Sequence, residues 1–439
     1  MSEQTSSSAA STPVIGSPSA AFQARYALRD AAAGIITGTM AIPLSVGIAM
    51  MSDYPIKVGL ATVVFASLVG WLFSWFRPGN YIGSPGIAAG LAPVLAMGVS
   101  SFGIQNMAFC IFLTAVIQAV IWKYNWQRYL LVAVPVYLVE GLLAGVGLKI
   151  FLKFFTFTYE LPPELEQAGS FFTMARVQML LISALAFGGF VYLFNTFREK
   201  QPAIPYFVLI ISSVVFAYFV PVPMLRTEDA SLALALPLPK IDGPLVLLTM
   251  VAFCLMLAVI DVIEQVMSNA AIEKIDPLGR KCDSNNSLLA IWVANLGSSF
   301  FGGMTNLDGL AKSTTNRLAG AYTKFSLLFI ALVVGFFTIQ IEYLQYLPKF
   351  SLAAIMLFSG YKMVAGLVHV TQYGRYPLIL AILCGGLVYV VGIFEGLLIA
   401  MAIHVIIHFM VYTQNEKIPG KEVVKRYFEN LKKDSSRFS

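Results

Sequence analysis

The sequence predicts an all-α polytopic membrane protein, and three observations support that fold class. Hydrophobic residues make up 58% of the 439 residues and charged residues only 12%, about half the charged fraction of a typical soluble domain. The apolar residues gather into segments of roughly 20 residues, the length with which a helix crosses a bilayer. Two of these segments are short and follow glycine-containing stretches, which is typical of transporters built from two repeats. A soluble globular protein is therefore excluded.

Fourteen apolar segments are predicted, in two blocks of seven. Their ranges are 28–51, 57–76, 84–100, 104–122, 128–153, 175–197, 203–221, 244–270, 287–301, 307–320, 321–340, 350–367, 376–392 and 394–413. The third segment of each block is the short one: 84–100 follows YIGSPG, and 307–320 follows FGGMTN. Short, glycine-broken segments at matching places in two halves predict a binding site between them.

Basic residues predict the orientation of the chain, because short cytoplasmic loops carry an excess of Lys and Arg. They gather in the loops after even-numbered segments and in the C-terminal tail, at Arg77, Lys123, Arg128, Arg198, Lys200, Lys274, Arg280, Lys281, Arg375, Lys417, Lys421, Lys425, Arg426, Lys432 and Lys433. Both termini are therefore predicted to be cytoplasmic. Because seven is an odd number, the second block runs opposite to the first. The two short helices then enter from opposite sides, with their N-termini facing each other.

The chain is predicted to form one membrane domain with a short tail at each end. Residues 1–27 are expected to be a disordered cytoplasmic tail, since their start is rich in Ser and Ala and lacks the basic start and apolar core of a signal peptide. The membrane domain covers residues 28–413, with a first repeat at 28–221 and a second at 244–413. Residues 414–439 form a basic tail that is shorter than the ~50 residues of a folded domain.

The stretch from Gly302 to Ala321, GGMTNLDGLAKSTTNRLAGA, is too polar for its place between apolar segments. Ionisable residues at membrane depth are costly unless they face protein or a water-filled cavity, so Asp308, Lys312 and Arg317 indicate a functional site. A short helix is predicted to follow Asp308 and to end at Gly320. Its unpaired first amides and positive dipole end favour an anion.

The eighth segment, VAFCLMLAVIDVIEQVMSNAA, carries Asp261 and Glu264 three residues apart on one helix face. Two carboxylates in an apolar span are not expected to face lipid. A carboxylate beside an anion site can supply an oxygen ligand to sodium or carry a proton. The alternative is a structural role for Glu264 as a partner of Lys312 or Asn269.

Other features of the sequence carry less weight. Pro43 is predicted to break the first helix and to free carbonyls beside the site. Glu140 and Lys149 are a candidate ion pair in the fifth segment. His404 and His408 lie one turn apart without a third ligand, which favours placement at a helix end over a metal site. The four scattered cysteines are predicted to be buried hydrophobes. The sequence has no phosphate loop, nucleophile with a base or metal cluster, so an enzyme is not expected.

Four stretches carry a resemblance to a known family. They are AGIITGTMAIPLSVGIAM (Ala33 to Met50), IGSPGIAAGL (Ile82 to Leu91), AVIDVIEQVMSNAAIEKI with GRKCDSNNSL, and GGMTNLDGLAKSTTNRLAGAYTK. In this order and spacing, the chain from roughly Asp30 to Val411 resembles the SulP sulfate permease and inorganic anion transporter family, also called solute carrier family 26. The resemblance implies a seven-plus-seven inverted repeat with a core domain and a gate domain, an elevator-like movement of anions, and a homodimer. Family members usually carry a cytoplasmic STAS domain, which is not expected in the residues after 413.

The resemblance also implies roles for individual residues. The anion is expected between the amide ends of the third and tenth helices, at Gly86, Ile87, Ala88, Asp308, Gly309 and Leu310, with Lys312 and Pro43 beside it. Glu264 matches the acidic position that handles the coupling cation or proton, and Ser268 matches a hydroxyl that helps to bind sodium in bicarbonate-transporting relatives. Asp261 is expected to support them, and Glu264, Ser268 and Asp308 together are the candidate sodium ligands. Leu44 after the proline is a modest sign against sulfate.

Asp308 departs from the family, which mostly has a small neutral residue there. Three interpretations remain open: it caps the helix away from the site, it pairs with Lys312 one turn later, or the substrate is not a simple anion. The third interpretation matches a rival function, a proton-coupled symporter of uracil or xanthine with the related seven-plus-seven fold. A channel or a voltage-responsive membrane protein that does not transport is a second rival.

The expected function is cation-coupled transport of a small inorganic anion of the bicarbonate or sulfate class. Sodium ions or protons are the expected coupling ions, and no other cofactor is expected. The expected location is the inner membrane of a bacterium. The expected partners are the anion, membrane lipid and a second copy of the chain, and no nucleic acid.

Overall fold

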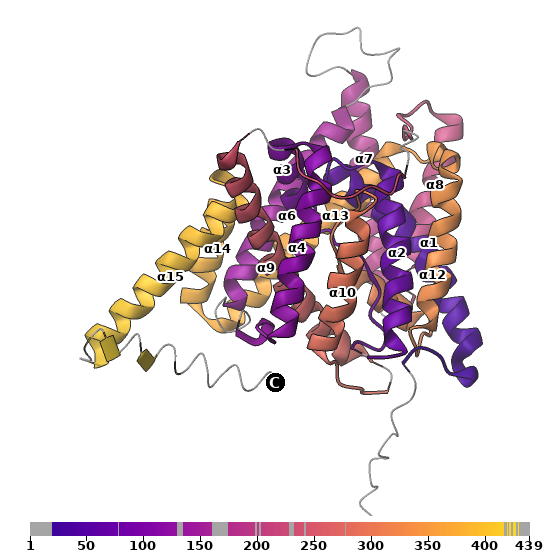
Figure 1. The fold of residues 1–439 in the computed structure, drawn as a ribbon. Helices are drawn as coiled ribbons and strands as arrows, with labels where there is room; N and C mark the ends of the chain where they lie inside the picture. Colours follow the sequence, from indigo (N-terminus) through magenta and orange to yellow (C-terminus); the bar gives the residue numbers. More distant parts are fainter. Residues whose placement is uncertain are drawn as a thin grey trace, which may run out of the picture.

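The computed structural model describes residues 20–77, 79–129, 135–159, 174–197, 200–201, 203–227, 232–240, 243–276, 278–416, 419, 421–422, 425–426 and 429. Each of the fourteen predicted segments corresponds to one α-helix of this part of the chain, so the predicted fold class is confirmed (Figure 1). Of the helices in the described residues, six are long and apolar enough to cross a membrane by themselves.

The helices are named here in chain order. The first half contains α1 (Ala27–Met51), α2 (Ile56–Ser74), α3 (Ala92–Phe102), α4 (Ile104–Lys123), α6 (Val136–Tyr159), α7 (Met174–Phe197) and α8 (Ile204–Phe219). The second half contains α9 (Pro244–Ile275), α10 (Ser284–Ser299), α11 (Leu310–Leu318), α12 (Phe325–Ile339), α13 (Lys349–Val370), α14 (Arg375–Val390) and α15 (Ile393–Glu416). In the described residues, three short 3-10 helices connect or precede them: η1 (Ala24–Tyr26), η2 (Ile341–Tyr346) and η3 (Thr371–Tyr373).

The helices form two bundles, and each bundle takes helices from both halves of the chain. In the core bundle, α1 packs on α12 and α2, α10 packs on α4 and α2, and α9 packs on α4 and α11. In the gate bundle, α6 packs on α13, α14 and α15, and α7 packs on α13 and α8. Helices α14 and α15 lie at one side of Figure 1, whereas α1 and α12 lie at the other. The predicted division into core and gate domains is therefore present.

Glycines allow the closest helix contacts within each bundle. A β-carbon on Gly141 or Gly145 of α6 would overlap the backbone of α14, at Ala381 and Gly385. A β-carbon on Gly34 of α1 would likewise overlap the backbone of α12. Small residues are common at helix interfaces in membranes because they let the backbones approach, and dispersion contacts are then the main attraction.

Two short strands pair near the centre of the core bundle. Strand β1 (Pro85–Ile87) and strand β2 (Asn306–Asp308) are antiparallel, with Gly86 opposite Leu307. Helix α3 follows β1 and helix α11 follows β2, so each half contributes one strand and one short helix. Because the strands run in opposite directions, the two segments enter the pair from opposite ends, as an inverted repeat requires.

Two local features differ from the prediction. The stretch YIGSPG before the third helix was expected to be extended, and Pro85 to Ile87 are indeed extended, but they form a strand and α3 begins only at Ala92. Edge-to-edge pairing with β2 satisfies the backbone there without a helix. Pro43 was expected to break the first helix, but α1 continues from Ala27 to Met51 through it. A membrane helix tolerates an internal proline where neighbouring groups satisfy the freed carbonyl.

Candidate functional site

Buried amides hold the strand pair in place. Gln265 of α9 accepts a hydrogen bond from the backbone amide of Asp308 at 2.7 Å through its Oε1. Asn295 of α10 accepts one from the backbone amide of Asn306 at 2.6 Å. Both ends of β2 are therefore tied to helices of the core bundle. In addition, the backbone amide of Gly309 donates to the carbonyl of Ser84, which extends the pairing with the first half by one residue.

A cavity of about 440 Å³ opens beside the strand pair, between the core and gate bundles. Its core wall contains residues that follow both strands and a turn of α9, and its gate wall contains residues of α6 and α13. The lining residues are Leu44, Ile48, Ile87, Ala88, Ala89, Gly90, Glu140, Leu143, Tyr206, Glu264, Met267, Ser268, Ala271, Leu307, Gly309, Leu310, Ala311, Lys312, Phe358, Ser359, Lys362 and Met363. The cavity is mostly apolar with a few charged groups, which is the usual character of a small-molecule site.

Helix α11 presents its N-terminus to this cavity. Its N-cap residue, Gly309, has no side chain to cap the first amides, and Gly309, Leu310 and Ala311 all line the cavity. The first amides of a helix carry a partial positive charge and have no partner within the helix, so they attract anions. Helix α3 also begins without a side-chain cap, and Ala88, Ala89 and Gly90 before it line the same cavity.

Lys312 brings a full positive charge to the same place. Its side chain is only 2% exposed, and its Nζ lies 3.4 Å from the carbonyl oxygen of Pro85 in β1. Gly86 makes this position possible, because a β-carbon there would overlap the Lys312 ammonium, and Gly86 also has a φ of +150° that favours glycine. The ammonium therefore lies against the strand pair and at the start of its own helix.

Glu264 and Ser268 lie one turn apart on α9 and both line the cavity. The carboxylate of Glu264 lies against Gly90, where any β-carbon would overlap its Oε1. Its Oε2 is buried and has no hydrogen-bond partner among the described residues. A buried oxygen of this kind is costly unless a proton, a cation or water satisfies it.

Asp308 points away from this cavity. Its Oδ2 accepts hydrogen bonds from Gln265 at 3.0 Å and from Ser287 at 2.9 Å, and its Oδ1 lies 3.8 Å from the ammonium of Lys324. The interpretation that favoured a pair with Lys312 is therefore wrong, since the ion pair is with Lys324. Lys324 follows α11 in the sequence and also donates to the carbonyl of Gly83 at 2.6 Å. Tertiary packing, not helical spacing, selects the partner.

Asp261 belongs to a separate polar cluster behind the strands. Its Oδ2 accepts hydrogen bonds from Gln118 at 2.7 Å and from Asn295 at 3.2 Å, and the same Asn295 holds Asn306. Asp261 is fully buried and does not line the cavity. Asp261 therefore contacts a residue that holds strand β2, and its expected support of Glu264 and Ser268 stays a prediction.

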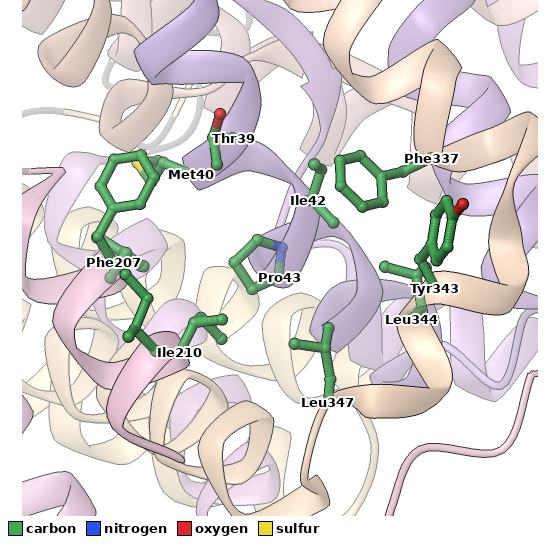
Figure 2. Close-up of a pocket in the computed structure, with 12 residues that line it drawn as sticks. Thr39, Met40, Ile42, Pro43, Phe207, Ile210, Phe337, Tyr343, Leu344 and Leu347 are labelled. Atoms are coloured by element: carbon green, nitrogen blue, oxygen red, sulfur yellow. The ribbon is translucent and has the colours of Figure 1, made fainter. Parts of the chain in front are cut away.

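Pro43 lines a different pocket, which Figure 2 shows between α1, α8, α12 and η2. Apart from Thr39, the residues around Pro43 in Figure 2 are apolar or aromatic, including Phe207, Ile210 and Phe337. Leu44, the next residue, faces the candidate cavity instead. Of these two residues of the first helix, Leu44 and not Pro43 lines the candidate cavity.

The structure brings together most of the residues that the sequence assigned to the site. Seven of them line one cavity: Ile87, Ala88, Glu264, Ser268, Gly309, Leu310 and Lys312. Gly86 lies beside this cavity, in contact with Lys312, whereas Pro43, Asp261 and Asp308 lie elsewhere. Consequently the three candidate sodium ligands are divided, with Glu264 and Ser268 in the cavity and Asp308 outside it.

The structure also places Arg317 and the two histidines His404 and His408, which the sequence singled out. Arg317 donates to the carbonyl of Ile275, the last residue of α9, where a cation complements the helix dipole. His404 contacts the hydroxyl groups of Tyr137 and Tyr376, and its ring is tilted by 42° relative to that of His408, with 5.8 Å between the ring centres. The described residues contain no group of three His, Cys, Asp or Glu side chains that could hold a metal ion.

Sequence reasoning did not assign Gly90, Glu140 and Lys362 to the site. Glu140 had been considered as a partner of Lys149, but it lines the cavity and lies against Gly366 of α13. Gly90 could have been found by comparing the halves, because Gly90-Leu91-Ala92 repeats the sequence of Gly309-Leu310-Ala311. No signal in the sequence predicted that α6 and α13 would supply the opposite wall.

Comparisons with known proteins concern the family and the fold of the chain. Residues 28–384 match the model of the sulfate permease family. The protein YvdB of Bacillus subtilis (strain 168), whose name refers to sulfate transport, is 26% identical over 356 residues, which are 76% of this chain. The chain spans 64% of the length of that relative.

Two solved structures share the fold. The transmembrane domain of the bicarbonate transporter BicA from a cyanobacterium matches with a TM-score of 0.68 at 16% identity, over 87% of this chain and 98% of that one. The murine anion transporter Solute Carrier 26 family member A9, in an inward-facing state, matches with a TM-score of 0.70 at 15% identity, over 88% of this chain and 69% of that one.

Proposed function

Because the chain belongs to the sulfate permease family, we propose that it is a secondary active transporter of a small inorganic anion of the bicarbonate or sulfate class, coupled to sodium ions or protons. The observation that supports this most directly is that one cavity contains Lys312, the uncapped start of α11 and the carboxylate of Glu264. Positive groups for an anion and an oxygen ligand for a cation are thus close enough to act on the same transport cycle.

In the proposed mechanism, the anion binds beside the strand pair. The first amides of α11 and the Lys312 ammonium attract it, and Gly309 lets it approach the backbone. A point charge such as the Lys ammonium does not require the planar, two-point contact that an Arg makes, so it suits anions of several shapes. The substrate contacts are proposed at Ile87, Ala88, Gly309, Leu310 and Lys312.

Glu264 is the proposed coupling residue, with Ser268 as its partner. When Glu264 is ionised and has no sodium ion bound, its carboxylate repels an anion in the same cavity. A sodium ion or a proton on Glu264 removes that repulsion, so the cation and the anion bind cooperatively. Sodium would take oxygen ligands from Glu264 and Ser268, whereas Asp308, which is engaged with Gln265, Ser287 and Lys324, is left out of the proposed ligand set.

The position of the cavity between two bundles supports a proposed elevator-like movement. In this movement the core bundle carries the bound anion past the gate bundle. We also propose that the protein is a homodimer in the inner membrane of a bacterium, with cytoplasmic termini and repeats at 28–221 and 244–413. The rival function, nucleobase symport, used the carboxyl groups of both Glu264 and Asp308 to contact the base. Glu264 lines the cavity but Asp308 does not, so the rival lacks one of its two proposed contacts.

The test is uptake of labelled bicarbonate, sulfate and uracil by the purified protein in liposomes, each with and without a sodium or proton gradient. Saturable, gradient-dependent uptake of one of the anions is expected. Uptake of uracil alone, or uptake that does not saturate, would contradict the proposal. Glu264→Gln is expected to abolish gradient-driven accumulation. Glu342→Gln, which changes an exposed carboxylate outside the cavity, is the matched control and should accumulate the anion normally.

A further inference from the structure

The gate wall of the cavity has a carboxylate that the proposed mechanism does not use. Glu140 projects from α6, lines the cavity and lies against α13 at Gly366, where a β-carbon would overlap its Oε2. Gly366 therefore makes room for the carboxylate, as Gly90 does for Glu264 on the core wall. Each wall thus contains one carboxylate that lies against a glycine.

The charge of Glu140 faces the space that the anion must enter. In the described part of the chain, Glu140 has neither a hydrogen-bond partner nor an ion-pair partner, and His369 in the last turn of α13 is the side chain whose charge acts on it. The nearby cation on the gate wall, Lys362, has its ammonium over the rings of Phe194 and Phe358, at 5.2 and 5.4 Å from their centres. Glu140 therefore adds a fixed negative potential to a cavity with mostly apolar walls, where charges are screened less than in water.

We infer that Glu140 is a selectivity residue that discriminates against divalent anions in favour of monovalent ones. This inference rests on the proposed anion transport. The repulsion between a fixed carboxylate and an anion is proportional to the charge of the anion, so sulfate is repelled about twice as strongly as bicarbonate. Removing the carboxylate lowers the KM for bicarbonate by some factor and the KM for sulfate by about the square of that factor.

The experiment measures the KM for sulfate and for bicarbonate in liposomes at one pH and ionic strength, for the wild type and for Glu140→Gln. If Glu140→Gln lowers the KM for bicarbonate about threefold, it lowers the KM for sulfate about ninefold. The ratio of the sulfate KM to the bicarbonate KM then falls about threefold. Glu395→Gln is the control, because this exposed carboxylate of α15 does not line the cavity, and its ratio should not change.

A second variant adds charge to the same wall. Ser359 of α13 lines the cavity, and Ser359→Asp should raise the sulfate to bicarbonate KM ratio about threefold, opposite to Glu140→Gln. This variant decides the question if Glu140→Gln does not fold. An unchanged ratio in a folded Glu140→Gln variant, or in Ser359→Asp, overturns the inference and leaves the proposed function standing. A wild-type protein that takes up neither anion overturns the proposed function instead.

Discussion

The two strand and helix segments, β1 with α3 and β2 with α11, use the same backbone arrangement but contribute different chemistry. The chain from Pro78 to Trp122, which contains the first segment, has no ionisable Asp, Glu, Lys or Arg, whereas the second segment has Asp308, Lys312 and Arg317. The first segment supplies space instead. Gly86 makes room for the ammonium of Lys312, and Gly90 makes room for the carboxylate of Glu264.

This difference shows how an inverted repeat can make a charged site at low cost. Two symmetric segments with charges would place like charges near each other at membrane depth, where each is expensive. With charges in one segment and glycines in the other, each buried ion lies against a backbone that approaches closely. The comparison predicts that changes in the second segment act through charge, whereas changes in the first act through space.

The largest effect is expected from removing the ammonium of Lys312, which is the charge of the second segment that lines the cavity. Lys312→Met should reduce anion uptake about 100-fold, because a cation near a bound anion contributes a few kcal/mol at low effective dielectric. Initial uptake rates in liposomes measure this. Arg317→Met is the control on the same helix, since its guanidinium contacts the end of α9 and not the cavity. Equal losses in both variants would contradict the separate role of Lys312.

Filling the space of the first segment should have the next largest effect. Gly86→Ala places a β-carbon on the Lys312 ammonium and forces a residue other than glycine to a φ of +150°, a strain of about 1–3 kcal/mol. Uptake should fall at least about tenfold through displacement of Lys312. Gly188→Ala on α7, where nothing lies within 4 Å of the new β-carbon, should transport normally. Normal uptake by Gly86→Ala would show that the position of the ammonium is not critical.

A smaller and more selective effect is expected at the second glycine of the first segment. Gly90→Ala should displace the carboxylate of Glu264 and raise the sodium or proton concentration for half-maximal uptake, by about tenfold. The KM for the anion at saturating cation should change less than about threefold. Titrations of uptake against the cation measure the first quantity, and titrations against the anion measure the second. A change in the anion KM alone would assign Gly90 to the substrate and not to coupling.

The smallest effect on uptake is expected at Asp308, the carboxylate of the second segment that points away from the cavity. Asp308→Asn breaks the buried pair with Lys324, so the free energy of unfolding should fall by about 1–3 kcal/mol. The anion KM should stay within about twofold of the wild-type value. Thermal unfolding in detergent and uptake kinetics measure the two quantities. A large change in KM with unchanged stability would mean that Asp308 contacts the substrate.

Much of the fold followed from the sequence, because membrane segments are specified by local composition. The length of each apolar run and the two glycine-containing interruptions predicted the helices and the broken segments. The polar residues between apolar runs also indicated the site, since Glu264 and Lys312 have few alternatives to facing a cavity. The pairing of the two strands was missed because three residues are too few for a strand pattern of their own, and each is a strand only through its partner.

What the sequence by itself determined is therefore the number of spans, the two breaks and the main charged residues of the site, since burial in lipid constrains each segment separately. The tertiary structure alone decided which groups meet. It paired Asp308 with Lys324 and not with Lys312, placed Leu44 and not Pro43 at the cavity, and placed Glu140 on the opposite wall. These outcomes depend on how helices distant in the sequence pack together, and the local spacing of one helix contains no information about that packing.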